Sequence, residues 1–122
     1  MGILTMILVA LVAAEHLYFL ILEMFLWHRP LGLKTFKMTR EMAESTRALA
    51  ANQGLYNGFL AAGLLYGMVT CDGPLGFAFL IFFLICVIIA GLFGAATISR
   101  RILYVQALPG ALALAALLLR GI

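Results

Sequence analysis

Residues 2–27 read GILTMILVALVAAEHLYFLILEMFLW, and this stretch decides the fold. A helix of about 20 apolar residues crosses the ~30 Å hydrocarbon core of a bilayer, and this run is longer than that. It contains three ionisable side chains, Glu15, His16 and Glu23. A charge at mid-membrane costs roughly 2.5–3.5 kcal/mol by insertion scales, so such groups usually face a protein interior or a wet cavity. We therefore expect a membrane-spanning helix that carries a polar site.

The composition agrees with a membrane protein. Of the 122 residues, 66% are hydrophobic and only 11% are charged, against about 25% charged in soluble domains. The mean hydropathy is +1.15. The net charge of +3 does not indicate a nucleic-acid partner, because the basic residues flank apolar runs instead of forming one basic face. The partner that this composition predicts is the lipid bilayer.

Four apolar runs are long enough to span a membrane: 2–27, 48–69, 75–98 and 102–119. Backbone polar groups in lipid need internal partners, so these runs must be helices. Short links at 70–74 and 99–101 require neighbouring helices to run antiparallel. The chain is therefore predicted to be all-α, a single transmembrane domain built as an integral membrane four-helix up-down-up-down bundle.

The segment 28–47 is the one long polar connection. It opens with the helix-breaking stretch Arg29-Pro30-Leu31-Gly32. Its second half can form a short helix capped by Thr39, either at the membrane interface or as an extension of the second span. His28 reads as an interfacial residue beside Arg29.

Basic residues predict the orientation of the bundle. Seven of them lie in the first and third connections: Arg29, Lys34, Lys37, Arg40, Arg47, Arg100 and Arg101. The only other basic residue is Arg120, at the far end of the last run. The positive-inside rule then places both connections in the cytoplasm and both termini outside. The first run has no basic region before it and continues past its small residues, so we expect it to be retained and not cleaved.

Polar side chains collect on single faces of the predicted helices. At 100° per residue, Glu15, His16 and Glu23 fall within about 100° of one another. The second run places four polar residues within about 140°, and the fourth run adds one amide. We interpret them as a polar seam that runs from the cytoplasmic third of the membrane inward to the Glu15–His16 pair. Its members are Glu15, His16, Glu23, Asn52, Gln53, Tyr56, Asn57 and Gln106.

Three interpretations of the seam compete. The amides and acids could hold the helices together, with Glu23 paired to Arg47 or neutral in a hydrogen bond. The acid and imidazole could instead bind a small molecule or relay protons. A metal site is disfavoured, because His16 and Glu23 lie about 10.5 Å apart along the helix axis and the second run offers only amides and a phenol. We predict no metal and no cofactor.

The third run carries a face of small residues, which permits close approach of another helix. This face could pack inside the bundle or against a second copy of the chain. A homo-oligomer would then form through Ala90, Gly91, Gly94 and Ala95.

Four strings resemble a small bacterial membrane family, the domain of unknown function 1304. They are EHLYFLILEMFLW (15–27), AANQGLYNGFLAAG (50–63), IIAGLFGAAT (88–97) and RILYVQALPG (101–110). The resemblance covers essentially the whole chain and implies four spans in the bacterial inner membrane, with a loose kinship to DoxX-like four-helix proteins. It also implies that the seam residues other than Tyr56 are motif positions. It supplies no reaction.

The resulting functional hypothesis is a site that binds or translocates a small amphipathic or cationic molecule, with proton linkage through Glu15 and His16. One alternative is a membrane-embedded enzyme that acts on a lipid or quinone by acid/base chemistry at the same two residues. Another is a non-catalytic assembly subunit. Small multidrug-resistance transporters share only the outline of four short spans with a glutamate in the first, which is an analogy.

Overall fold

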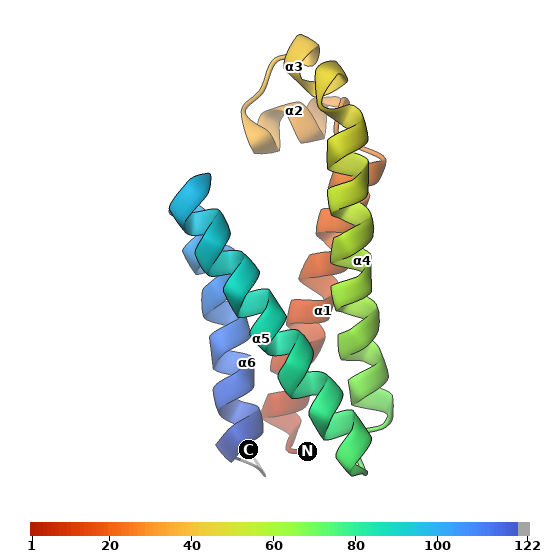
Figure 1. Cartoon of the computed structure of the whole chain (residues 1–122), viewed down its shortest axis with the longest axis vertical. Helices are drawn as coiled ribbons and strands as arrows, with labels where there is room; N and C mark the ends of the chain where they lie inside the picture. Colours follow the sequence, from red (N-terminus) through yellow and green to blue (C-terminus); the bar gives the residue numbers. More distant parts are fainter. Residues whose placement is uncertain (120–122) are drawn as a thin grey trace. The chain divides into compact units, whose positions relative to one another are not determined.

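Every regular element of the computed structural model, which describes residues 1–119, is helical (Figure 1). The all-α prediction is therefore confirmed for these residues, whereas Arg120 lies outside them. The elements in chain order are α1 (Ile3–Met24), α2 (Pro30–Phe36), α3 (Arg40–Ser45), α4 (Arg47–Val69), α5 (Pro74–Thr97), the π-helical turn η1 (Leu103–Ala107) and α6 (Leu108–Leu119).

The chain divides into two compact units. Unit 1 comprises Met1–Ala13 and Leu60–Ile122, and unit 2 comprises Ala14–Phe59. Helices α1 and α4 each contribute one half to unit 1 and the other half to unit 2. Unit 1 also holds α5, η1 and α6, and unit 2 holds α2 and α3.

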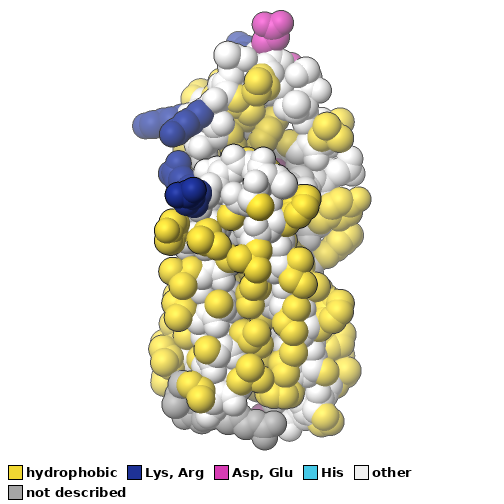
Figure 2. All heavy atoms as spheres, turned by 60° about the vertical axis from the view of Figure 1, so that its left-hand side comes forward, with side chains coloured by type: hydrophobic (Ala, Val, Ile, Leu, Met, Phe, Trp, Pro, Cys, Tyr) yellow, Lys and Arg dark blue, Asp and Glu magenta, His cyan; other side chains and the backbone are white. Residues whose placement is uncertain are grey.

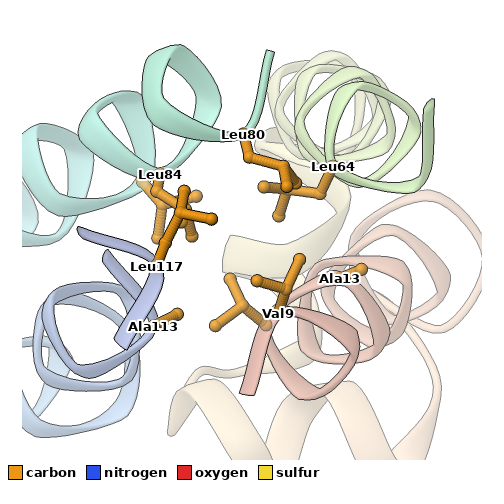
Figure 3. Close-up of a cluster of buried hydrophobic side chains, with 9 residues drawn as sticks. Val9, Ala13, Leu64, Leu80, Leu84, Ala113 and Leu117 are labelled. Carbon is orange, nitrogen blue, oxygen red and sulfur yellow. The ribbon is translucent and has the colours of Figure 1, made fainter. Parts of the chain in front are cut away.

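The core of unit 1 is an apolar cluster to which α1, α4, α5 and α6 all contribute (Figure 3). No side chain in it is more than 5% exposed. The close packing of these side chains holds the four helical segments of the unit together by van der Waals contact. The members are Val9, Val12, Ala13, Leu64, Leu80, Leu84, Val87, Ala113 and Leu117.

Helix α5 packs against η1 and α6 at glycine positions. A Cβ atom added at Gly91 would lie 2.7 Å from the backbone nitrogen of Ala107, and one at Gly94 would lie 3.2 Å from Cγ2 of Ile102. Gly91 and Gly94 therefore pack against residues of the same chain. Of the small-residue face, Ala90 is exposed and Ala95 is half-buried, so a homo-oligomer through this face stays a prediction.

The π-helical turn lies where the sequence predicted an uninterrupted helix over 102–119. Pro109 has no N–H to donate to the carbonyl of Val105, so the regular α-helical bond is missing there. The chain accommodates this by widening one turn, in which Leu108 N donates to the carbonyl of Leu103. Such π turns are rare and occur within helices that are otherwise regular.

Two described helices, α1 and α5, are long and apolar enough to cross a membrane. Helix α4 falls short because its first half carries polar side chains, and the apolar stretch Leu103–Leu119 is shorter. Large hydrophobic side chains are exposed on all of these helices, and Figure 2 shows them spread over the face that it presents. Association with a membrane is thus supported, whereas the four-span bundle and its orientation stay proposals.

The polar connection in unit 2 is more ordered than the sequence indicated. Pro30 does not break a helix but begins α2, at the first helical position where its missing N–H costs nothing. The capping prediction for Thr39 is confirmed, since its Oγ1 accepts a hydrogen bond from Met42 N at 3.1 Å. Gly32 is buried, and a Cβ atom there would clash with the carbonyl oxygens of Leu26 and Trp27.

The contact at Gly91 gives a stability prediction. Gly91→Ala should lower the free energy of unfolding by about 1–3 kcal/mol, because the new methyl group meets the backbone of Ala107, which cannot rotate away. Gly73→Ala is the matched control, since nothing lies within 4 Å of a Cβ atom there. Its effect should stay within about 0.5 kcal/mol. Unfolding of the purified protein in detergent measures both, and equal effects would contradict this packing.

Candidate functional site

A carboxyl group and an amide meet between α1 and α4 in unit 2. The side-chain nitrogen of Asn57 donates a hydrogen bond of 2.6 Å to Oε1 of Glu23. Asn57 is 7% exposed, and Glu23 is half-buried. A short bond of this kind is typical of a carboxylate or strongly polarised acceptor. Of the predicted seam residues, these two are brought into direct contact.

Two glycines bring the helices close enough for this bond. A Cβ atom at Gly54 would lie 2.6 Å from Cγ of Met24, and one at Gly58 would lie 2.7 Å from Cδ1 of Leu20. The spacing of Gly54 and Gly58 is the small-xxx-small pattern of closely packed membrane helices. A small-residue face was predicted only for the third run, although the spacing of Gly54 and Gly58 in the second run is visible in the sequence.

Glu15 and His16 lie two turns earlier on α1. His16 is fully buried, and its ring packs edge-on against Phe19 with the ring centroids 5.3 Å apart. Glu15 is half-buried, and its Oε1 is buried without a hydrogen bond to any residue that the structure describes. A buried polar atom without a partner is uncommon in native proteins and calls for a proton, water or ligand.

The other polar residues of α4 are exposed on unit 2. The amide of Asn52 turns back onto its own helix and donates to the carbonyl of Ala48 at 3.1 Å. Gln53 is exposed as well, and Tyr56 is 57% exposed, with its ring 6.1 Å from that of Phe59. On the polar face of α4, Asn57 is therefore buried, whereas Asn52, Gln53 and Tyr56 are exposed.

Gln106 is part of η1, in unit 1. Its amide nitrogen donates to the carbonyl of Val87 in α5 at 3.3 Å. Val87 is four residues before Gly91 in α5, and Gly91 contacts Ala107 of η1. The Gln106 bond therefore joins α5 to η1, as the Gly91 contact does. Gln106 therefore has a packing role in unit 1, as the structural interpretation of the amides predicted for it.

The pairing of Glu23 with Arg47 is not observed. Arg47 instead approaches Glu44, with 3.8 Å between Nη1 and Oε2, and both side chains are about half exposed. Surface pairs of this kind contribute about 0–1 kcal/mol. Glu23 is satisfied by the neutral amide of Asn57.

Two partly open pockets are found among the described residues. One belongs to unit 1 and has a volume of about 360 Å³, with Thr5, Cys71 and Phe77 in its lining. The other belongs to unit 2, has a volume of about 500 Å³ and is lined by residues of the 28–47 connection. Neither of these two pockets is lined by Glu15, His16 or Glu23. No group of three or more potential metal-binding side chains occurs within residues 1–119.

The Glu23–Asn57 bond gives a second stability prediction. Asn57→Ala leaves the carboxyl group of Glu23 half-buried without this partner, which should cost about 1–3 kcal/mol of unfolding free energy. Asn52→Ala removes an amide from the exposed face of the same helix and should change stability by less than about 0.5 kcal/mol. Denaturation in detergent distinguishes the two variants, and an Asn57→Ala protein as stable as Asn52→Ala would refute the importance of the bond.

Comparison with known proteins places the chain in a family. Residues 10–118 match the family described as "Protein of unknown function (DUF1304)". "Uncharacterized protein YpaA" of Lactococcus lactis subsp. lactis (strain IL1403) is 37% identical over 120 residues, which cover 97% of each chain. No solved structure matches the chain. The kinship to DoxX-like proteins stays a prediction. On the family match and the relative together, the chain is a member of the DUF1304 family of proteins of unknown function.

Proposed function

We propose that this protein is a multi-pass protein of the bacterial inner membrane that binds or translocates a small amphipathic or cationic molecule, with proton linkage. The acids of α1 and the imidazole of His16 would exchange the proton. The amides and the phenol of α4 would contact the molecule itself. Both roles are thereby assigned to one polar region of unit 2, which consists of Glu15, His16, Glu23, Asn52, Gln53, Tyr56 and Asn57.

The observation that carries the proposal is the buried Oε1 atom of Glu15, which makes no hydrogen bond with a described residue. A group that only joined helices would be paired, as Glu23 is with Asn57. An unsatisfied carboxyl oxygen in apolar surroundings favours uptake of a proton or a cationic group. The adjacent His16 supplies a second side chain that can carry a proton.

The arrangement of α4 supports a ligand-binding role for its amides. Gln53 and Asn57 are one turn apart, so the exposed part of the polar face directly adjoins the amide that binds Glu23. Exposed amides and a phenol on an apolar helix have hydrogen-bonding capacity that lipid chains cannot satisfy. A polar or cationic group bound there would satisfy it next to a buried acid.

The surface of the chain supports the membrane location. Thirty-odd large hydrophobic side chains would be exposed to water if the described residues were in aqueous solution, far beyond the scattered apolar residues of a soluble surface. Basic residues lie in the connections at 28–47 and 99–101, which favours a cytoplasmic location for both.

The proton-linked function predicts the behaviour of Glu15→Gln. Glutamine has the same shape but cannot exchange a proton, so coupled movement of a cationic probe should be lost. Vesicles containing the purified protein, with an imposed pH gradient and ethidium as the probe, measure this as the initial rate of probe movement. We expect the rate in the variant to fall to that of protein-free vesicles.

Glu41→Gln is the matched control, because Glu41 is an exposed acid in α3 outside the polar region. Its rate should equal that of the unchanged protein. If Glu15→Gln is folded in detergent and still moves the probe at the unchanged rate, proton linkage through Glu15 is wrong.

The orientation can be tested with single cysteines. In a background with Cys71→Ser and Cys86→Ser, Asp72→Cys should react with a membrane-impermeant maleimide in intact spheroplasts. Arg100→Cys should react only after the membrane is permeabilised. Asp72 and Arg100 are both exposed in the folded chain, so a difference in labelling reports the side of the membrane and not burial of the cysteine. The reverse pattern of labelling would place the termini in the cytoplasm.

A further inference from the structure

We propose that the pocket of about 500 Å³ in unit 2 is a binding site for a phosphate-bearing anion. It is lined by residues from the start of the first connection, the start of α2 and both ends of α3: His28, Arg29, Pro30, Arg40 and Glu44. The two short helices lie close to one another in Figure 1. This site is separate from the acid and amide residues of the proposed transport function and does not depend on them.

The pocket has the size of a ligand site. Small-molecule pockets usually have volumes of about 300–1,000 Å³. Its walls are held by the structure around it: Gly32 packs against the backbone of Leu26 and Trp27, and Thr39 caps the start of α3. Trp27 Nε1 also donates to Oγ1 of Thr46 at 3.1 Å, which ties the two ends of the connection together. The positions of the pocket residues on the backbone are therefore defined before any ligand arrives.

The side chains of the two arginines at the pocket have no partner among the residues that the structure describes. Within the described range 1–119, the guanidinium group of neither Arg29 nor Arg40 makes a hydrogen bond or an ion pair, although the backbone of Arg29 bonds Leu26 and Leu33. The one acid in the lining, Glu44, approaches Arg47, which reduces the negative charge that it presents. Two guanidinium groups and an imidazole therefore lie around an open volume with unused hydrogen-bond donors.

Guanidinium groups favour a phosphate over a simple anion. Their planar donors form paired hydrogen bonds with two oxygens of one phosphate, which adds geometric selectivity to charge attraction. The neighbouring imidazole of His28 can donate one more bond. A carboxylate would be satisfied by one arginine, whereas a phosphate has enough oxygens to use both arginines and the imidazole.

Membrane orientation alone does not account for this arrangement. The positive-inside effect depends on how many basic residues a connection carries and not on their convergence. Lys34 and Lys37 lie in the same connection and are exposed, as Arg29 and Arg40 are, but they do not line the pocket. Substitution of these two lysines therefore measures how much of the binding comes from general charge attraction and not from the pocket.

The shared chemistry of the ligand is its phosphate, which could belong to a lipid headgroup or to a free soluble ion. Two probes distinguish the sources: dioleoylphosphatidylglycerol, compared with dioleoylphosphatidylcholine, and inorganic phosphate, compared with chloride at equal ionic strength. Native mass spectrometry of the full chain in maltoside detergent measures lipid binding, and titration calorimetry measures phosphate binding. Binding of the phosphatidylglycerol alone identifies a headgroup site, and binding of inorganic phosphate identifies a site for the free ion.

The decisive comparison is between two double variants that each remove two positive charges. Arg29→Gln with Arg40→Gln should weaken binding of the effective probe about tenfold or more, because paired hydrogen bonds are lost. Lys34→Gln with Lys37→Gln should weaken it by no more than about threefold. Equal losses in the two variants, or no binding of either probe to the unchanged protein, would overturn the proposal.

Glu44→Gln provides a test that does not depend on the stability of the arginine variant. Removal of the only acid in the lining should raise the affinity for the same probe severalfold. An unchanged or lower affinity in this variant would also overturn the proposal. Thermal unfolding in detergent confirms that each variant is folded before its affinity is compared.

Discussion

A carboxyl group in an apolar helix must find a hydrogen-bond donor, and the pairing of α1 with α4 in unit 2 follows from that requirement. The amide of Asn57 reaches Glu23 at 2.6 Å where Gly54 and Gly58 add no side chain of their own and Met24 and Leu20 of α1 pack against them. A side chain at either glycine would displace Met24 or Leu20, and without the bond the close approach would leave a half-buried acid without this partner. The glycine contacts and the Glu23–Asn57 bond both hold α1 against α4, and α1 is the helix that carries Glu15 and His16.

Unit 1 uses a different principle, in which apolar packing and small residues dominate. Its core consists of aliphatic side chains from α1, α4, α5 and α6, and Gly91 lets α5 contact the backbone of Ala107. The polar residue Gln106 here adds one bond to the carbonyl of Val87. An amide therefore joins helices in each unit, and unit 2 in addition retains an acid, Glu15, with an oxygen that makes no hydrogen bond to a described residue.

Much of the fold was predictable, because apolar length and the need for internal backbone bonds specify helices wherever the four runs occur. The cap at Thr39 was also predictable from its residue type. The contact of Glu23 with Asn57 was not, since helix faces could be assigned but the partner of each acid depends on how two helices approach. The π turn was missed because Pro109 indicated only a lost donor. The sequence did not predict that Arg29 and Arg40 line one pocket. Pro30 was interpreted as a helix breaker, whereas it begins α2, and the fold of the connection therefore differs from the expected one.

The widened turn at Leu103–Ala107 also constrains how the length of this chain can vary. It accommodates one residue more than an α-helical turn over the same rise, so removal of one residue there would restore regular spacing. The segment before the turn and α6 would keep their present faces, because the widened turn already absorbs the extra residue. Only side chains within the turn would be displaced, among them Gln106, which bonds the carbonyl of Val87, and Ala107, which lies against Gly91. A one-residue gap at this place is therefore compatible with the same arrangement of α5 and α6.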